Sequence, residues 1–173
     1  MVIDRFSGIH VATLHGQFPP GLFADKLAAL GWMYNTALVV VERNNHGHAV
    51  LLALSRPTEE APGLPARKAY PRIYTGRDGK PGWCSSDISR SAALDGFENA
   101  IRKRQWPTRD ARVIGELFSF EVTKSGKAEA KSGSYDDLVM ASAIGHDVVS
   151  KPIASLGRTR VSGGSSIDDT PLG

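Results

Sequence analysis

The chain has 173 residues and only one cysteine, Cys84, which excludes an intrachain disulfide. We therefore expect a reducing, cytosolic setting, and a packing role for this lone thiol beside Trp83. No apolar run approaches the roughly 18 residues that a membrane span needs. The first five residues, Met1 to Arg5, do not resemble a signal peptide. These absences predict a protein with no membrane association.

The sequence also lacks internal repeats and any strong excess of one charge. Its length suits one domain, its hydrophobic fraction is an ordinary 41%, and its formal net charge is +3. This mild basicity permits binding to a polyanion without requiring it. The densest cations are Arg102-Lys103-Arg104, Arg109 and Arg112. They fit either a solvated helix end and loop or a patch that contacts phosphates.

The first half of the chain alternates strand-like and helix-like segments. We expect a hairpin over residues 1–15, turning at Ser7-Gly8, and a buried strand at Ala37–Val41. Apolar residues at near-helical spacing predict three helices. These are one carrying Phe23, Leu27, Leu30 and Tyr34, one from about Gly47 to Leu54, and one after Ser89 that ends at Trp106-Pro107. Residues 55–91 are irregular, with a small hairpin in "RIYTGRDGKPGW".

The second half predicts a long strand, a turn, a returning strand and a last helix. The strand begins near Arg112 and alternates through Val122, with Lys124–Lys127 as the turn. The helix in "SGSYDDLVMASAIG" directs Leu138, Ala141, Ile144 and Val148 toward the core. Residues 151–173 resemble a disordered tail. The order predicts an α/β domain over residues 1–150, with a mixed sheet flanked by helices.

Two places put carboxylates where they can act chemically. Glu42 directly follows the buried run Ala37–Val41, and Asp136-Asp137 stand at the start of the last helix. Acids from a strand end and a helix start can converge on Mg²⁺, which prefers oxygen ligands. Two such ions about 4 Å apart activate a water and stabilise the leaving oxygen of a phosphodiester.

Each acid also has a simpler structural explanation. Ser134-Tyr135-Asp136-Asp137 fits the S-x-x-D capping pattern, so Asp137 can serve only to cap its helix. Glu42 can pair with Arg43 or another arginine. Spacing within the sequence leaves these alternatives open.

Three further residues bear on a metal site. His46 and His48 flank Gly47, but no Cys or His lies at zinc-ligand spacing, so we favour helix capping or surface roles. Glu116, in the middle of the predicted long strand, either supports a metal ligand or faces solvent near the rim. We favour the solvent-facing interpretation.

The sequence resembles the C-terminal nuclease domain of tailed-phage terminase large subunits over roughly residues 1–148. The resemblance is carried by "FADKLAALGWMYNTALVVVERNNHGHAVLLAL", "YPRIYTGRDGKPGW" and "ARVIGELFSFEVTKSGKAEAKSGSYDDLVMASAIG". It implies an RNase H-like fold and a Mg²⁺- or Mn²⁺-dependent endonuclease that cuts concatemeric double-stranded DNA during packaging. Glu42 would match the second catalytic acid, and Asp136 and Asp137 the last acidic step, where one or both bind metal. A portal protein and a small terminase subunit, in the host cytoplasm, would be the partners.

The resemblance is incomplete at its start. The family's first catalytic acid is an Asp on the first strand of the fold, whereas this chain begins at what resembles the second strand, and Asp4 does not match. A phosphate-binding loop of the form G-x-x-x-x-G-K-[ST] is also absent. We therefore expect an N-terminally truncated nuclease domain, whose sheet edge next to Val39 is unpaired and open to self-association. Alternatives are a catalytically silent DNA-binding or motor-docking module of the same fold, and a nuclease that resembles Holliday-junction resolvases.

Overall fold

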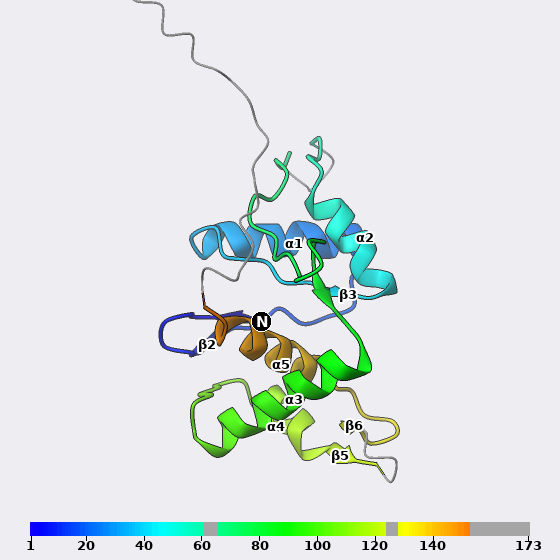
Figure 1. Ribbon diagram of the computed structural model, residues 1–173. Coiled ribbons are helices and arrows are strands. Elements are labelled where there is room, and N and C mark those ends of the chain that lie inside the picture. Colours follow the sequence, from blue (N-terminus) through cyan, green and yellow to red (C-terminus); the bar gives the residue numbers. More distant parts are fainter. Residues whose placement is uncertain (61–65, 124–127, 153–173) are drawn as a thin grey trace, which may run out of the picture.

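A computed structural model describes residues 1–60, 66–123 and 128–152, which form a mixed α/β fold (Figure 1). The predicted α/β class is confirmed at this level. No helix among these residues is long and apolar enough to cross a membrane. In chain order the elements are β1 (Val2–Ile3), β2 (His10–Ala12), α1 (Pro20–Met33), β3 (Glu42–Arg43), α2 (Asn45–Leu54), β4 (Trp83–Cys84), α3 (Asp87–Arg102), α4 (Ala111–Phe118), β5 (Phe120–Val122), β6 (Ala128–Ala130) and α5 (Asp137–Val149).

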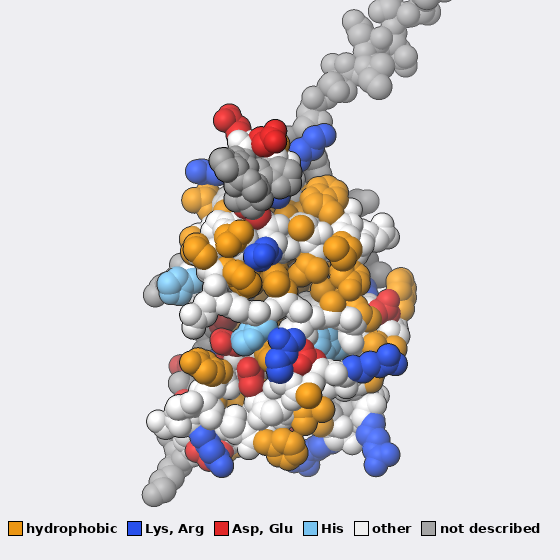
Figure 2. Space-filling model, turned by 180° about the vertical axis from the view of Figure 1, so that it is seen from behind, with side chains coloured by type: hydrophobic (Ala, Val, Ile, Leu, Met, Phe, Trp, Pro, Cys, Tyr) orange, Lys and Arg blue, Asp and Glu red, His pale blue; other side chains and the backbone are white. Residues whose placement is uncertain are grey.

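The helices form two layers with extended segments between them. Figure 1 shows α1 and α2 on one side of these segments, and α3 and α5 on the other. Each layer has its own group of buried side chains, the first around Ala24, Ala28 and Leu54, the second around Phe97 and Ala143. Seen from behind, hydrophobic side chains gather on the half of the molecule that holds α1 (Figure 2).

The run that precedes Glu42 lies between the two layers. Val39 and Val41 are buried in the α1/α2 cluster, whereas Leu38 and Val40 pack against the α3/α5 cluster. Since successive side chains of a strand point to opposite faces, an apolar residue is required at every position. The predicted burial is confirmed for Val39 and Val41, but the strand is shorter and displaced: within Ala37–Val41 only Val39 forms a bridge, to Ile73, and the regular strand β3 is Glu42–Arg43. The apolar sequence of the run follows from contact with a helical layer on both sides.

Parallel pairing fixes the direction of the central segments. The Val39 N–H donates to the carbonyl of Arg72, and the Val39 carbonyl accepts from the N–H of Tyr74, both at 2.8 Å. Farther along, Glu42 of β3 lies opposite Trp83 of β4 in parallel register. In the described residues the strands form three two-stranded sheets, because β1–β2 and β5–β6 are separate antiparallel pairs.

The predicted long strand from Arg112 is wrong over most of its length. Residues Ala111–Phe118 form the helix α4, and only Phe120–Val122 are a strand. The Asp110 side chain accepts from the backbone N–H of Arg112 and starts the helix. Val113 is fully buried, and Leu117, four residues later, packs against the α3/α5 cluster. The apolar residues of this run therefore follow helical spacing, and the Asp110 cap fixes where the helix begins.

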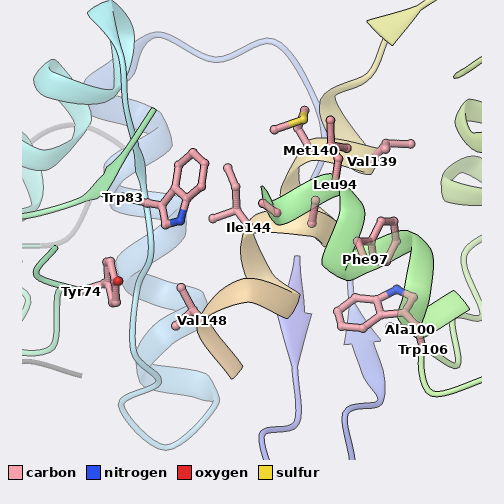
Figure 3. Packing of buried hydrophobic residues seen from close by; sticks show 12 residues of the cluster. Tyr74, Trp83, Leu94, Phe97, Ala100, Trp106, Val139, Met140, Ile144 and Val148 are labelled. Atoms are coloured by element: carbon pink, nitrogen blue, oxygen red, sulfur yellow. The ribbon is translucent and has the colours of Figure 1, made fainter. Parts of the chain in front are cut away.

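Other predicted elements agree with the structure apart from their ends. The hairpins at residues 1–15 and 72–83 are present, the second through the Gly76 N–H, which donates to the carbonyl of Lys80. Helix α3 begins at Asp87 and ends at Arg102 rather than at Trp106-Pro107. Trp106 instead packs edge-on against Phe97, with ring centroids 5.3 Å apart (Figure 3). The predicted turn at 124–127 and the tail from 153 lie outside the described residues.

Candidate functional site

Glu42 is the first residue of β3, directly after the extended run 37–41, and it is half-buried on the face that points toward α3 and α5. It continues the alternation of Leu38 and Val40, which pack against that layer. Its Oε2 accepts a hydrogen bond of 3.3 Å from Nδ2 of Asn44. Arg43 pairs with Asp78 at 2.5 Å, so the predicted pairing of Glu42 with Arg43 is wrong.

The turn after Glu42 is fixed by close backbone packing. Oδ1 of Asn44 accepts from the backbone N–H of Gly47 at 2.8 Å and caps α2. A Cβ on Gly47 would lie 1.8 Å from the Glu42 carbonyl oxygen, so no other residue fits without moving the strand end. Asn44 rather than a histidine is therefore the cap, and His46 and His48 are exposed. The sequence E-x-N-x-x-G thus has a local purpose, which is to hold the backbone of Glu42.

Asp136 and Asp137 have different surroundings at the start of α5. Oδ2 of Asp136 lies 2.5 Å from Nη2 of Arg90, with both side chains partly exposed. Nε of Arg90 is buried and has no partner among the described residues. Asp137 is exposed in the first turn of α5. Asp136 is therefore neutralised by a cation, whereas Asp137 is open to solvent.

Glu116, not the S-x-x-D pattern, caps α5. Its Oε2 accepts from the backbone N–H of Leu138 at 2.8 Å and of Val139 at 3.0 Å. The capping interpretation of Ser134 and Asp137 is wrong, and so is the solvent-facing interpretation of Glu116. Since Glu116 comes from a helix 22 residues earlier than Leu138, no local pattern identifies it.

The elements that carry these residues end or begin on one side of the fold (Figure 1). Because β3 and β4 are parallel, they end at the same side, and α3 begins there at Asp87. Arg90, in the next residues of α3, holds Asp136 at the start of α5. Figure 1 shows the end of β3 and the starts of α3 and α5 on the same, right-hand side. We name Glu42, Asp87, Asp136 and Asp137 the acid edge.

Sequence reasoning missed Asp87 as a member of this edge. Ser86 and Ser89 form a capping box around it, so an acid in the first turn of α3 has an ordinary helical role. Asp87 is linked to the predicted site only through Arg90, three residues later on α3, which pairs with Asp136.

Carboxylate oxygens suit Mg²⁺ or Mn²⁺, and the acid edge offers no other ligand type. In the part of the chain that the structure describes, no three His, Cys, Asp or Glu side chains form a ready-made metal site. Glu42 and Asp137 have no Lys or Arg within ion-pair distance there, and Asp136 is held by Arg90. The donor chemistry thus fits a divalent ion, and the sharing of one ion by these acids stays a prediction.

An apolar groove lies elsewhere on the molecule. It has a volume of about 550 Å³ and runs between α1 and residues 66–68, lined by apolar side chains such as Leu22, Ala29 and Trp32. Its acid, Asp25, pairs with Arg67 at 2.9 Å. None of the predicted site residues lines it, so this groove and the acid edge are separate features.

Comparison with known proteins adds no identification. Neither a protein-family model nor a curated protein matches the chain.

Proposed function

We propose that the chain is the metal-dependent nuclease domain of a phage DNA-packaging terminase, with an RNase H-like fold. One observation carries the proposal: Glu42 lies in the short parallel strand β3, and β3 and the start of α5, with Asp136 and Asp137, are on the same side of the fold (Figure 1). In α/β folds, ligands bind outside the carboxyl ends of parallel strands. The resemblance to terminase nuclease domains supplies the reaction class.

Glu42, Asp137 and Asp136 would hold one or two Mg²⁺ or Mn²⁺ ions. A bound ion supplies an activated water and stabilises the leaving oxygen of a phosphodiester. Asn44 occupies Oε2 of Glu42 and leaves Oε1 for a ligand. Arg90 holds Asp136 in place and competes with the ion for its carboxylate. The proposed substrate is concatemeric double-stranded DNA, and the proposed partners are a portal protein and a small terminase subunit in the host cytoplasm.

Plasmid nicking tests this proposal. Supercoiled plasmid is incubated with Mn²⁺ and the wild-type chain, Glu42→Gln or Asp137→Asn. Asp95→Asn is the matched control, because Asp95 is an exposed acid on α3 with no ion pair in the described residues. Wild type and control are expected to nick equally, and both acid-edge variants to lose most of the activity. Nicking that survives both acid-edge substitutions rules out the proposed site.

A second candidate is a catalytically silent DNA-binding or motor-docking module. The Arg90–Asp136 pair favours it, because a guanidinium already neutralises one of the acids. In this case the wild-type chain binds duplex DNA but does not nick it at any Mn²⁺ concentration.

A further inference from the structure

Positive charge is concentrated in one short segment far from the acid edge. Residues 102–112 contain five cations and one acid, a net charge of +4, whereas the whole chain carries +3. The rest of the chain is therefore slightly acidic. We name residues 102–112 the basic loop, which comprises the end of α3, the connection to α4 and the first turn of α4.

Three of the five cations have no acidic partner. Arg102 pairs with Glu98, and Arg112 pairs with Asp110, both at 2.7 Å. Lys103, Arg104 and Arg109 are exposed, and no carboxylate of the described residues lies within ion-pair distance of them. These three side chains are therefore available to an anion from outside the chain.

The backbone that carries these cations is held in place. Arg104 has a left-handed φ of 55°, and its N–H donates to the carbonyl of Ile101 at 2.9 Å. Trp106 is buried against Phe97, as Figure 3 shows, and the Pro107 carbonyl accepts from the N–H of His10 at 3.3 Å. A fixed backbone lowers the entropy lost when such side chains bind a ligand.

Helix electrostatics explains only part of this arrangement. Cations near the C-terminus of a helix are stabilised by its dipole, which accounts for Arg102 and Lys103 at the end of α3. Arg109 directly precedes the Asp110 cap of α4, and Arg112 lies in its first turn, where the same dipole disfavours a cation. The pair with Asp110 accounts for Arg112, so Arg109 is the cation at the start of α4 that needs another explanation.

We infer that the basic loop is a contact surface for the phosphate backbone of duplex DNA, separate from the acid edge. The choice of DNA as the polyanion rests on the proposed function. Arg90 and Arg102 stand twelve residues apart on α3, about 18 Å along a helix axis. At about 3.4 Å per phosphate of one strand, this span equals about five base pairs. One duplex can thus contact both ends of α3.

The surface view agrees with this placement. Figure 2 shows Lys and Arg side chains spread around the lower end of the molecule, the end at which Figure 1 places α3 and α4. Such contacts position a duplex without reading its sequence.

Fluorescence anisotropy of a labelled 30-base-pair duplex tests the inference, using the full chain in EDTA so that cleavage plays no part. The test variant is Lys103→Gln/Arg104→Asn/Arg109→Gln, in which Asn tolerates the left-handed φ of position 104. The control, Arg56→Gln/Lys68→Gln/Arg77→Gln, removes three exposed charges elsewhere. Circular dichroism melting establishes that all three proteins are folded.

Loss of three phosphate contacts should reduce the slope of the logarithm of the association constant against the logarithm of the salt concentration by about 2.7. We expect this change in the test variant, with at least tenfold weaker binding, and little change in the control. Equal weakening in both variants, unchanged binding in the test variant, or no binding by the wild type overturns the inference. Binding to vesicles of phosphatidylserine and phosphatidylcholine but not to DNA also overturns it. Loss of plasmid nicking with binding in EDTA intact contradicts only the proposed catalytic function.

Discussion

Arg90, near the start of α3, lies 2.5 Å from Asp136, the residue directly before α5. The two residues are 46 positions apart in the sequence, so their ion pair links the start of α3 to the start of α5. It also reduces the negative charge of the acid edge, because it leaves three of the four acids, Glu42, Asp87 and Asp137, without a cationic partner in the described residues. An ion that used Asp136 as a ligand would have to share it with the guanidinium.

Removing the Arg90 guanidinium is expected to strengthen metal binding. Arg90→Gln frees the Asp136 carboxylate and raises the negative charge at the edge, so the Kd for Mn²⁺ should fall by about tenfold, or about 1.4 kcal/mol. Electron paramagnetic resonance of free Mn²⁺ measures this. Arg102→Gln is the control, because it removes an exposed arginine that pairs with Glu98 on the same helix. Unchanged or weaker Mn²⁺ binding by Arg90→Gln would show that Asp136 is no ligand.

Loss of the Glu116 carboxylate is expected to destabilise α5. Glu116→Ala leaves the N–H groups of Leu138 and Val139 without their acceptor and should cost about 1–2 kcal/mol of unfolding free energy. Glu116→Gln keeps an acceptor oxygen and should cost less. Urea unfolding measures both, with Glu98→Ala as the control because its exposed pair with Arg102 contributes about 0.3–0.5 kcal/mol. Equal stability of Glu116→Ala and wild type contradicts the capping role.

Alanine at position 47 is expected to displace Glu42. The added Cβ meets the Glu42 carbonyl, so the strand end must move, and we expect a loss of about 1–3 kcal/mol together with weaker Mn²⁺ binding. Gly115→Ala on α4 is the control. Nothing lies within 4 Å of its Cβ, and alanine there should stabilise the helix by about 0.5–1 kcal/mol. If both variants unfold at the same urea concentration as wild type, the turn is not tightly packed.

Tyr70 is expected to make the stability fall at high pH. Its hydroxyl donates to the carbonyl of Ala37 at 2.5 Å, and burial raises its pKa to about 12. In the unfolded chain the pKa of Tyr70 is about 10, so the protonated, hydrogen-bonded hydroxyl contributes its full stabilisation of the fold below pH 10. It is lost as the pH rises from about 10 to 12, because the unfolded chain releases this proton first.

The loss amounts to roughly 2–3 kcal/mol over that range. Urea unfolding between pH 9 and 12 measures it, with Tyr70→Phe as the control, which should lack this part of the pH dependence. Parallel curves for wild type and Tyr70→Phe would contradict the assignment to Tyr70.

Local patterns made the central strand and the positions of the acids predictable. The run Ala37–Val41 is apolar throughout, so it has to be buried whatever its neighbours are. The turn at Asn44 and Gly47 comes only a few residues later in the sequence. The start of α5 likewise follows from the apolar spacing after Asp137. In each of these cases the decisive residues are close in sequence.

The partners of those acids were not predictable, because they come from distant segments. Arg90 reaches Asp136 from another helix, and Glu116 reaches the N–H groups of α5. Helix α4 was missed although its sequence contains a helical signal. Its apolar residues form two pairs four positions apart, Val113-Ile114 and Leu117-Phe118, and the Asp110 cap precedes them.

Mn²⁺ binding to wild type, Glu42→Gln, Asp137→Asn and the double variant tests the central claim most directly. If both acids bind one ion, each single change should raise the Kd by about 10- to 100-fold. The double change should then raise it by less than the product of the two single effects. Wild-type affinity in both single variants, or effects that simply multiply, would show that Glu42 and Asp137 do not share an ion.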